Sequence, residues 1–158
     1  MRRLSELHLR HTGPILCLET VRAFEDYFQV TLPPSYPRFL SLANGGQPMI
    51  DCTFDYTTMF GELVTEADQV KEFGSLTNNN ESWSGIRRNT DFLRNVFSGL
   101  GRDISVVWIG SSTDGAMIYL DCATSPSPVY ALYRECDDTT PKIASSFENF
   151  IEGLYYRC

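Results

Sequence analysis

The sequence predicts a single α+β domain in which an antiparallel sheet packs against N-terminal, middle and C-terminal helices. Helical apolar patterns fill the first part of the chain, β-branched runs separated by turn residues fill the last third, and the two types do not alternate regularly. The chain has 158 residues, the size of one domain, so we expect residues 1–158 to form a single domain. Residues 1–17 are expected to form an irregular N-terminal segment. The chain is 42% hydrophobic and 13% aromatic, which suffices for a packed core.

The first two helices are predicted on either side of a proline pair. Apolar residues recur at spacings of three and four over 20–29, which indicates an amphipathic helix. Pro33-Pro34 prevents its continuation, because proline has no N–H to donate. A second, short helix is expected over 35–43 with Ser35 as N-cap, and it closes on Asn44-Gly45-Gly46, residues that tolerate positive φ.

The rest of the chain mixes strand and helix signals. Rough alternation over 49–60 indicates one or two strands, and the cap-like stretch Thr65-Glu66-Ala67-Asp68 predicts a helix over 65–73. Further helices are expected over 90–100 and 145–154, the latter from a Ser-Ser-Phe-Glu capping box. Antiparallel strands are predicted over 104–110, 116–121 and 128–135.

The charge of the chain limits its partners. The net charge of −7 and the isoelectric point near 4.7 disfavour binding to nucleic acid or to an anionic membrane, and favour a basic protein partner. Residues 51–81 contain seven acidic side chains against Lys71 alone. This run predicts a binding surface, with a merely solvated acidic face as the alternative.

The chain is expected to be soluble and cytoplasmic. Its N-terminus lacks the apolar region of a secretory signal, and no stretch approaches the ~20 apolar residues of a membrane span. Five cysteines stand singly, without a C-x-x-C pair, which argues against a disulfide framework or a zinc knuckle.

Catalytic and cofactor motifs are weak. The two histidines, His8 and His11, lie in the N-terminal segment, where they provide little for nucleophilic catalysis or for a metal site. Gly110–Gly115 lacks the lysine of a phosphate-binding loop, and Asp114-Gly115 favours a hairpin turn instead. We therefore predict no enzyme, no cofactor and no metal; an enzyme dependent on Cys122 or Cys136 is the weaker alternative.

Three stretches resemble the SUKH superfamily, which includes the yeast Smi/Knr-type cell-wall-assembly regulators and many bacterial immunity proteins. VRAFEDYFQVTLPPSYPRFLSLANGG (21–46) is similar to its opening signature. VVWIGSSTDGAMIYLD (106–121) is similar to its I-G-x-x-x-D-G strand pair, and IASSFENFIEGL (143–154) to its terminal helix. Residues 50–103 match no part of the family pattern, and they contain the acidic run.

The resemblance implies a non-enzymatic binding domain that neutralises a cognate bacterial toxin by occlusion. A toxin that acts on nucleic acid must be basic, which agrees with the acidic inhibitor. The alternative is an intracellular regulatory or scaffold domain without a toxin partner. The residues predicted to contact the partner are Asp51, Asp55, Glu62, Glu66 and Asp68, with Trp83 as an anchor unless it packs over the edge of the core.

Overall fold

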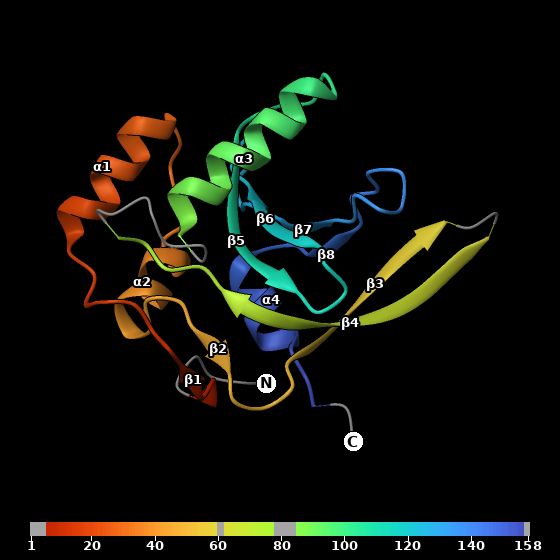
Figure 1. Ribbon diagram of the computed structural model, residues 1–158, viewed down its shortest axis with the longest axis horizontal. Coiled ribbons are helices and arrows are strands. Elements are labelled where there is room, and N and C mark those ends of the chain that lie inside the picture. The colour runs from red at the N-terminus through yellow and green to blue at the C-terminus, as the bar shows by residue number, and fades with distance from the viewer. Residues whose placement is uncertain (1–5, 60–61, 78–84, 157–158) are drawn as a thin grey trace.

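The computed structural model of the protein describes residues 6–59, 62–77 and 85–156 and confirms the α+β class (Figure 1). Its helices are α1 (Leu18–Phe28), α2 (Ser35–Leu42), α3 (Ile86–Gly99) and α4 (Phe147–Gly153). A six-stranded antiparallel sheet follows sequence order from β3 to β8, and β1 pairs with β2 in a second, two-stranded sheet. The strands are β1 (Leu9–Arg10), β2 (Gln47–Pro48), β3 (Thr53–Met59), β4 (Leu63–Phe73), β5 (Val106–Ser112), β6 (Met117–Asp121), β7 (Val129–Leu132) and β8 (Lys142–Ala144).

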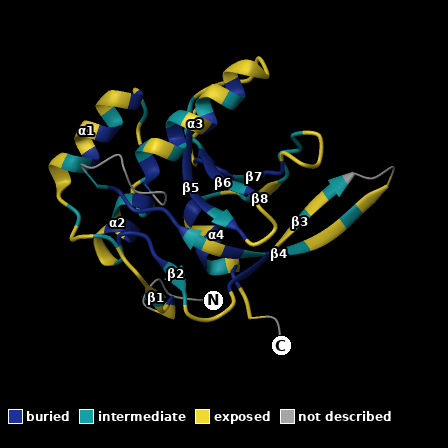
Figure 2. Cartoon of the chain, in the orientation of Figure 1, coloured by how far each residue is buried: buried dark blue, intermediate teal, exposed yellow. Residues whose placement is uncertain are grey.

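An aromatic cluster holds α2 and α4 against the sheet. Tyr36 and Phe39 of α2 meet Phe147 of α4 with ring centroids 4.9 and 5.3 Å apart. Phe39 also lies 5.2 Å from Phe73 of β4, and Phe73 lies 6.5 Å from Phe150 of α4. These side chains are almost fully buried (Figure 2), so the helix stripes predicted from the sequence form the main core.

The sheet curls toward a barrel. Its two edge strands, β3 and β8, approach each other. Between them lies a small apolar cluster in which Tyr56 of β3 and Ile143 of β8 pack against Ala116, Ala131 and Tyr133. This cluster supports one end of β3 and brings the segment after β7 next to the β3–β4 hairpin.

The helix predicted over 65–73 is wrong, because this segment forms most of the long strand β4. Phe54 and Tyr56 of β3 face Asp68 and Glu66 of β4 in register, so two acidic residues occupy successive positions on one face in the middle of β4. The period of two is therefore hidden from a search for apolar alternation, and pairing with β3 and β5 overrides the local helix-start signal.

The boundaries of the other predicted elements differ from the observed ones by a few residues. The helix expected to start at residue 90 begins at Ile86, and the N-cap of α2 is Pro34 with Ser35 as first helical residue. Ser146 caps α4 by accepting a hydrogen bond from the Asn149 N–H at 3.1 Å. The Asp114-Gly115 turn joins β5 to β6 with Gly115 at φ +85°, as the hairpin signal predicted. The sequence analysis did not predict the short strands β1, β2 and β8.

Asn44 connects three distant segments of the chain. Its buried side chain donates to the carbonyls of Pro14 and Leu76 at 2.7 and 2.8 Å and accepts from the Leu76 N–H at 2.7 Å. Gly45 follows at φ +73°, and a Cβ there would lie only 2.6 Å from the Gly74 backbone. Asn-Gly-Gly therefore joins the end of α2 to the end of β4 rather than only capping a helix.

The β3–β4 hairpin extends beyond the rest of the sheet (Figure 1). β4 pairs with β3 from Leu63 to Gln69, but with β5 only from Val70 to Phe73. We call residues 53–59 and 62–69 the arm. In the described part of the chain, no helix has the length and apolar character needed to cross a bilayer.

We expect Asn44→Ala to lower the free energy of unfolding by about 2–4 kcal/mol. The substitution leaves the buried Leu76 N–H and the two carbonyls without their partner. Denaturant unfolding of the variant and of the wild type measures the difference. Asn95→Ala, at an exposed position of α3, is the matched control. Equal losses in the two variants would contradict the connecting role of Asn44.

Candidate partner-binding site

The base of the arm is fixed by the buried carboxylate of Asp68. Its Oδ2 accepts a hydrogen bond from the Tyr133 hydroxyl at 2.8 Å, and its Oδ1 accepts from the Thr113 hydroxyl at 3.0 Å and the Gln69 N–H at 2.7 Å. Tyr133 follows β7 and Thr113 lies in the β5–β6 turn. Asp68 thus ties β4 to two other parts of the sheet, and its charge is satisfied by donors rather than by a cation.

Tyr56 and Tyr133 form a stacked pair beside this carboxylate. Their ring centroids are 4.9 Å apart, and the Tyr56 hydroxyl donates to Glu66 at 2.7 Å. Burial, together with the hydrogen bond to Glu66, raises the pKa of Tyr56 to about 12. Burial and the bond to Asp68 also raise the pKa of Tyr133. Both phenols therefore stay protonated near neutral pH and remain donors to the carboxylates.

The C-terminal segment after α4 supports the other side of the arm. The backbone of Tyr155 pairs with that of Thr53 through two hydrogen bonds of 2.8 and 3.0 Å. From there the Tyr155 hydroxyl donates to Asp55 of β3. Each of the two exposed carboxylates in the middle of the arm, Asp55 and Glu66, is thus oriented by a tyrosine.

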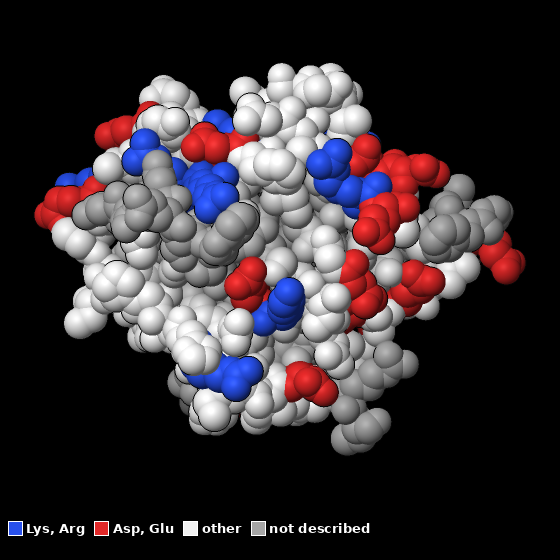
Figure 3. All heavy atoms as spheres, viewed as in Figure 1, with Lys and Arg blue, Asp and Glu red and all other residues white. Residues whose placement is uncertain are grey.

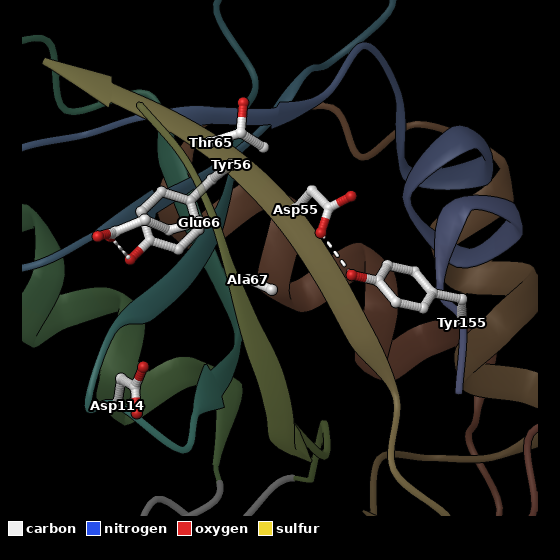
Figure 4. Close-up of a pocket in the computed structure, with 7 residues that line it drawn as sticks. All are labelled: Asp55, Tyr56, Thr65, Glu66, Ala67, Asp114 and Tyr155. Atoms are coloured by element: carbon white, nitrogen blue, oxygen red, sulfur yellow. Dashed lines mark hydrogen bonds between the residues drawn. The ribbon is translucent and has the colours of Figure 1, made fainter. Parts of the chain in front are cut away.

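A polar hollow of about 580 Å³ lies against the arm (Figure 4). Its described lining contains three carboxylates and no lysine, arginine or histidine. This composition favours a cationic ligand group over an anionic one. The lining residues are Asp55, Tyr56, Thr65, Glu66, Ala67, Asp114 and Tyr155.

The predicted contact residues fall into three groups. Asp51, Asp55, Glu62 and Glu66 are exposed on or next to the arm. Figure 3 shows acidic side chains gathered over the end of the molecule from which the β3–β4 hairpin extends in Figure 1. Asp68 is only 3% exposed, so it positions the arm instead of facing a partner directly. Trp83 lies outside the described residues. Asp55 and Glu66 both line the hollow, on opposite faces of the arm, because Asp55 pairs with Ala67 and Glu66 with Tyr56. Asp51 and Glu62 are exposed nearby in the sequence.

Sequence analysis missed Asp114, Tyr56 and Tyr155 as parts of this site. Asp114-Gly115 predicts only a hairpin turn, Tyr56 falls within the strand segment predicted over 49–60, and Tyr155 follows the helix predicted over 145–154. Tyr155 lies one hundred positions from Asp55 along the chain, so no local pattern links them. The one signal in the sequence that points to these residues is the acidic run itself. A carboxylate of this run that is buried in the fold needs hydrogen-bond donors, and tyrosine hydroxyls can supply them.

Cys122 lies outside this hollow. Cys122, one of the two thiols considered for catalysis, is partly buried, and burial raises its pKa to about 12. Such a thiol is protonated near pH 7 and is a poor nucleophile. Among residues 6–59, 62–77 and 85–156, no group of three or more His, Cys, Asp or Glu side chains is placed to hold a metal ion.

The fold and the site define a class: a small α+β domain with an acidic arm, suited to binding another protein. The model of the SMI1/KNR4 family (SUKH-1) matches residues 17–153, and the chain belongs to this family. The family is one of toxin immunity proteins. No curated protein and no solved structure is significantly similar to the chain. The resemblance found in the sequence is thereby confirmed, and the family match also spans the middle segment.

The raised pKa of Tyr56 predicts a loss of stability in alkali. A group whose pKa is higher in the folded state stabilises the fold below its unfolded value near 10, and this contribution is lost as the pH rises toward 12. We expect the free energy of unfolding to fall between about pH 10 and pH 12, and Tyr56→Phe to make this fall less steep. Denaturant unfolding across this range measures it. An unchanged slope in the variant would contradict the assignment to Tyr56.

The protonated state of Cys122 predicts slow alkylation. With iodoacetamide at pH 8, we expect Cys122 to react more than tenfold more slowly than the exposed Cys17 and Cys136, as read by mass spectrometry of the peptides. The same reaction in denaturant is the control, since unfolding should bring the rates together. Preferential labelling of Cys122 in the folded protein would instead support the Cys-dependent enzyme.

Proposed function

We propose that this protein is an immunity protein that binds a basic bacterial toxin through the acidic arm and neutralises it by non-catalytic occlusion. The single observation that carries the proposal is the arm, where exposed carboxylates surround a hollow without a basic lining residue. Family membership supports the same role. A cytoplasmic site of action is part of the proposal, because an immunity protein must meet its toxin where the toxin acts.

The charge distribution suits a basic partner in two ways. A net charge of −7 steers a cationic protein toward the complex, and the carboxylates of the arm concentrate this attraction on one surface. A toxin that acts on nucleic acid presents a cationic surface to its substrate. An acidic protein bound over that surface competes with the substrate, so inhibition needs no catalytic residue.

The tyrosines prepare this surface before binding. Tyr56 and Tyr155 hold Glu66 and Asp55 in fixed positions, and Asp68 holds the base of the arm. Fixed side chains lose less conformational freedom on association than free ones, which favours tight binding. The proposed inhibitor therefore presents a preformed charged surface.

The first test is neutralisation of the toxin encoded beside this gene. Coexpression with that toxin should restore growth, and the two proteins should copurify. A chain that neither protects cells nor copurifies with the neighbouring gene product would refute the immunity function. Absence of any toxin gene in the neighbourhood would favour the regulatory or scaffold role instead.

Charge reversal on the arm and at Asp51 next to it should slow association. The double variant Asp51→Lys and Glu62→Lys removes exposed carboxylates without touching the tyrosine bonds, and we expect the on-rate for the toxin to fall at least tenfold at low ionic strength. Stopped-flow mixing across a salt series measures the rate and its salt dependence.

The matched control for this variant is Glu6→Lys with Asp26→Lys, at exposed positions outside the arm. Each reversal adds two charges, so both double variants have a net charge of −3 instead of −7. Similar on-rates in the two variants would mean that only total charge matters and that the arm is a solvated acidic face.

A further inference from the structure

One edge of β4 is open along the arm. The Val70 N–H donates to the Cys52 carbonyl, which sets the phase of the β3–β4 ladder. Because antiparallel backbone groups alternate in direction, the N–H and C=O of Glu66 and Asp68 point to β3, whereas those of Thr65 and Ala67 point away from it. In the described part of the chain, no strand pairs with β4 on that outer side between residues 63 and 68.

The end of β5 explains why this edge is free. β5 pairs with β4 only as far as Val70, and the Thr113 N–H adds one last bond to the Gln69 carbonyl. The chain then turns through Asp114 into β6. The open stretch Leu63–Ala67 therefore continues the line along which β5 was hydrogen bonded, and five extended residues give it a length of roughly 17 Å.

The hollow beside the arm lies at this edge. Thr65 and Ala67, whose backbone groups are unpaired on the outer side, both line it, and so does Asp114 at the end of β5. Figure 4 shows these residues together with the carboxylates of Asp55 and Glu66, which lie on opposite sides of the arm. An approaching strand would thus meet free backbone groups and negative charge in the same place.

The charge decides between possible occupants. A second copy of this chain would bring its own acidic arm against this one, and like charges directly opposite each other across a strand pair are destabilising. A lysine- or arginine-rich strand would instead place cations beside Asp55, Glu66 and Asp114. Open sheet edges are common points of strand addition, with backbone bonds providing affinity and side chains providing selectivity.

We propose that an extended, lysine- or arginine-rich segment of the partner pairs as an additional strand with the Leu63–Ala67 edge of β4. This inference rests on the proposed function, in which the partner is a basic toxin, and it specifies how that partner is held. The strand continues the sheet where β5 leaves it. The Asp68 network keeps this edge in place before binding.

The test uses a defined probe, an acetylated and amidated peptide of four Lys-Val repeats, titrated into the ¹⁵N-labelled protein. Its control is the same peptide N-methylated on every residue, which keeps the side chains and charge but has no backbone donors. We expect the unmethylated peptide to bind at least tenfold more tightly. The amide signals of Thr65 and Ala67 should shift, and their hydrogen exchange should slow.

A pair of proline variants tests the same edge from the protein side. Ala67→Pro removes an outward N–H of β4, and Thr57→Pro removes an outward N–H on the opposite edge of the arm, so neither breaks the β3–β4 ladder. We expect Ala67→Pro to weaken peptide binding at least tenfold and Thr57→Pro to leave it within twofold. Thermal unfolding of both variants reports whether each variant still folds. If a variant does not fold, the comparison of the two peptides on the wild-type protein decides whether a strand is added at this edge.

Equal affinity of the two peptides, no binding of either, or signal changes confined to residues outside 63–67 would overturn strand addition. These results would leave the immunity function intact if the toxin is still neutralised and the Asp51→Lys, Glu62→Lys variant still associates slowly. Strand addition of the peptide without any neutralisation would have the opposite meaning, since the edge would be real and the toxin partner wrong.

Discussion

The buried carboxylate of Asp68 is the constraint on which the arm depends. A carboxylate that is 3% exposed must be satisfied, and donors from β4, the β5–β6 turn and the residue after β7 satisfy it. These contacts fix the point at which β4 leaves β5 and continues with β3 alone. Without them the hairpin would lack a defined direction relative to the sheet, and the exposed carboxylates farther along would not be held in one place.

The arm combines an open strand edge with acidic side chains placed beside it. Edge strands are commonly protected from pairing by charge, by proline or by a covering segment. Here the charge remains next to the open edge of β4, on Glu66, Asp55 and Asp114, so it discourages pairing with another copy of the same chain and favours a partner of opposite sign. The same carboxylates thus lie where they oppose pairing of the free protein with another copy of itself.

The aromatic residues fall into two groups, one in the core and one at the boundary between core and surface. Phe39, Phe73 and Phe147 fill the space between helices and sheet, where only volume and ring geometry matter. Tyr56, Tyr133 and Tyr155 lie at the boundary, each with its hydroxyl on a carboxylate. This arrangement couples the apolar interior to an acidic surface and fixes the positions of its carboxylates.

The sequence by itself determined the fold class, α1, α2 and α4, the β5–β6 hairpin, the family and the acidic character of residues 51–81, because each depends on neighbouring residues or on composition. Only the tertiary structure decided that residues 65–73 form a strand, that Asp68 is buried while Asp55 and Glu66 are exposed, and that Tyr133 and Tyr155 reach them. These contacts join residues 65 and 100 positions apart. A local pattern cannot encode such pairs, since the strand state of β4 is stabilised by hydrogen bonds and polar partners that exist only once the sheet has formed.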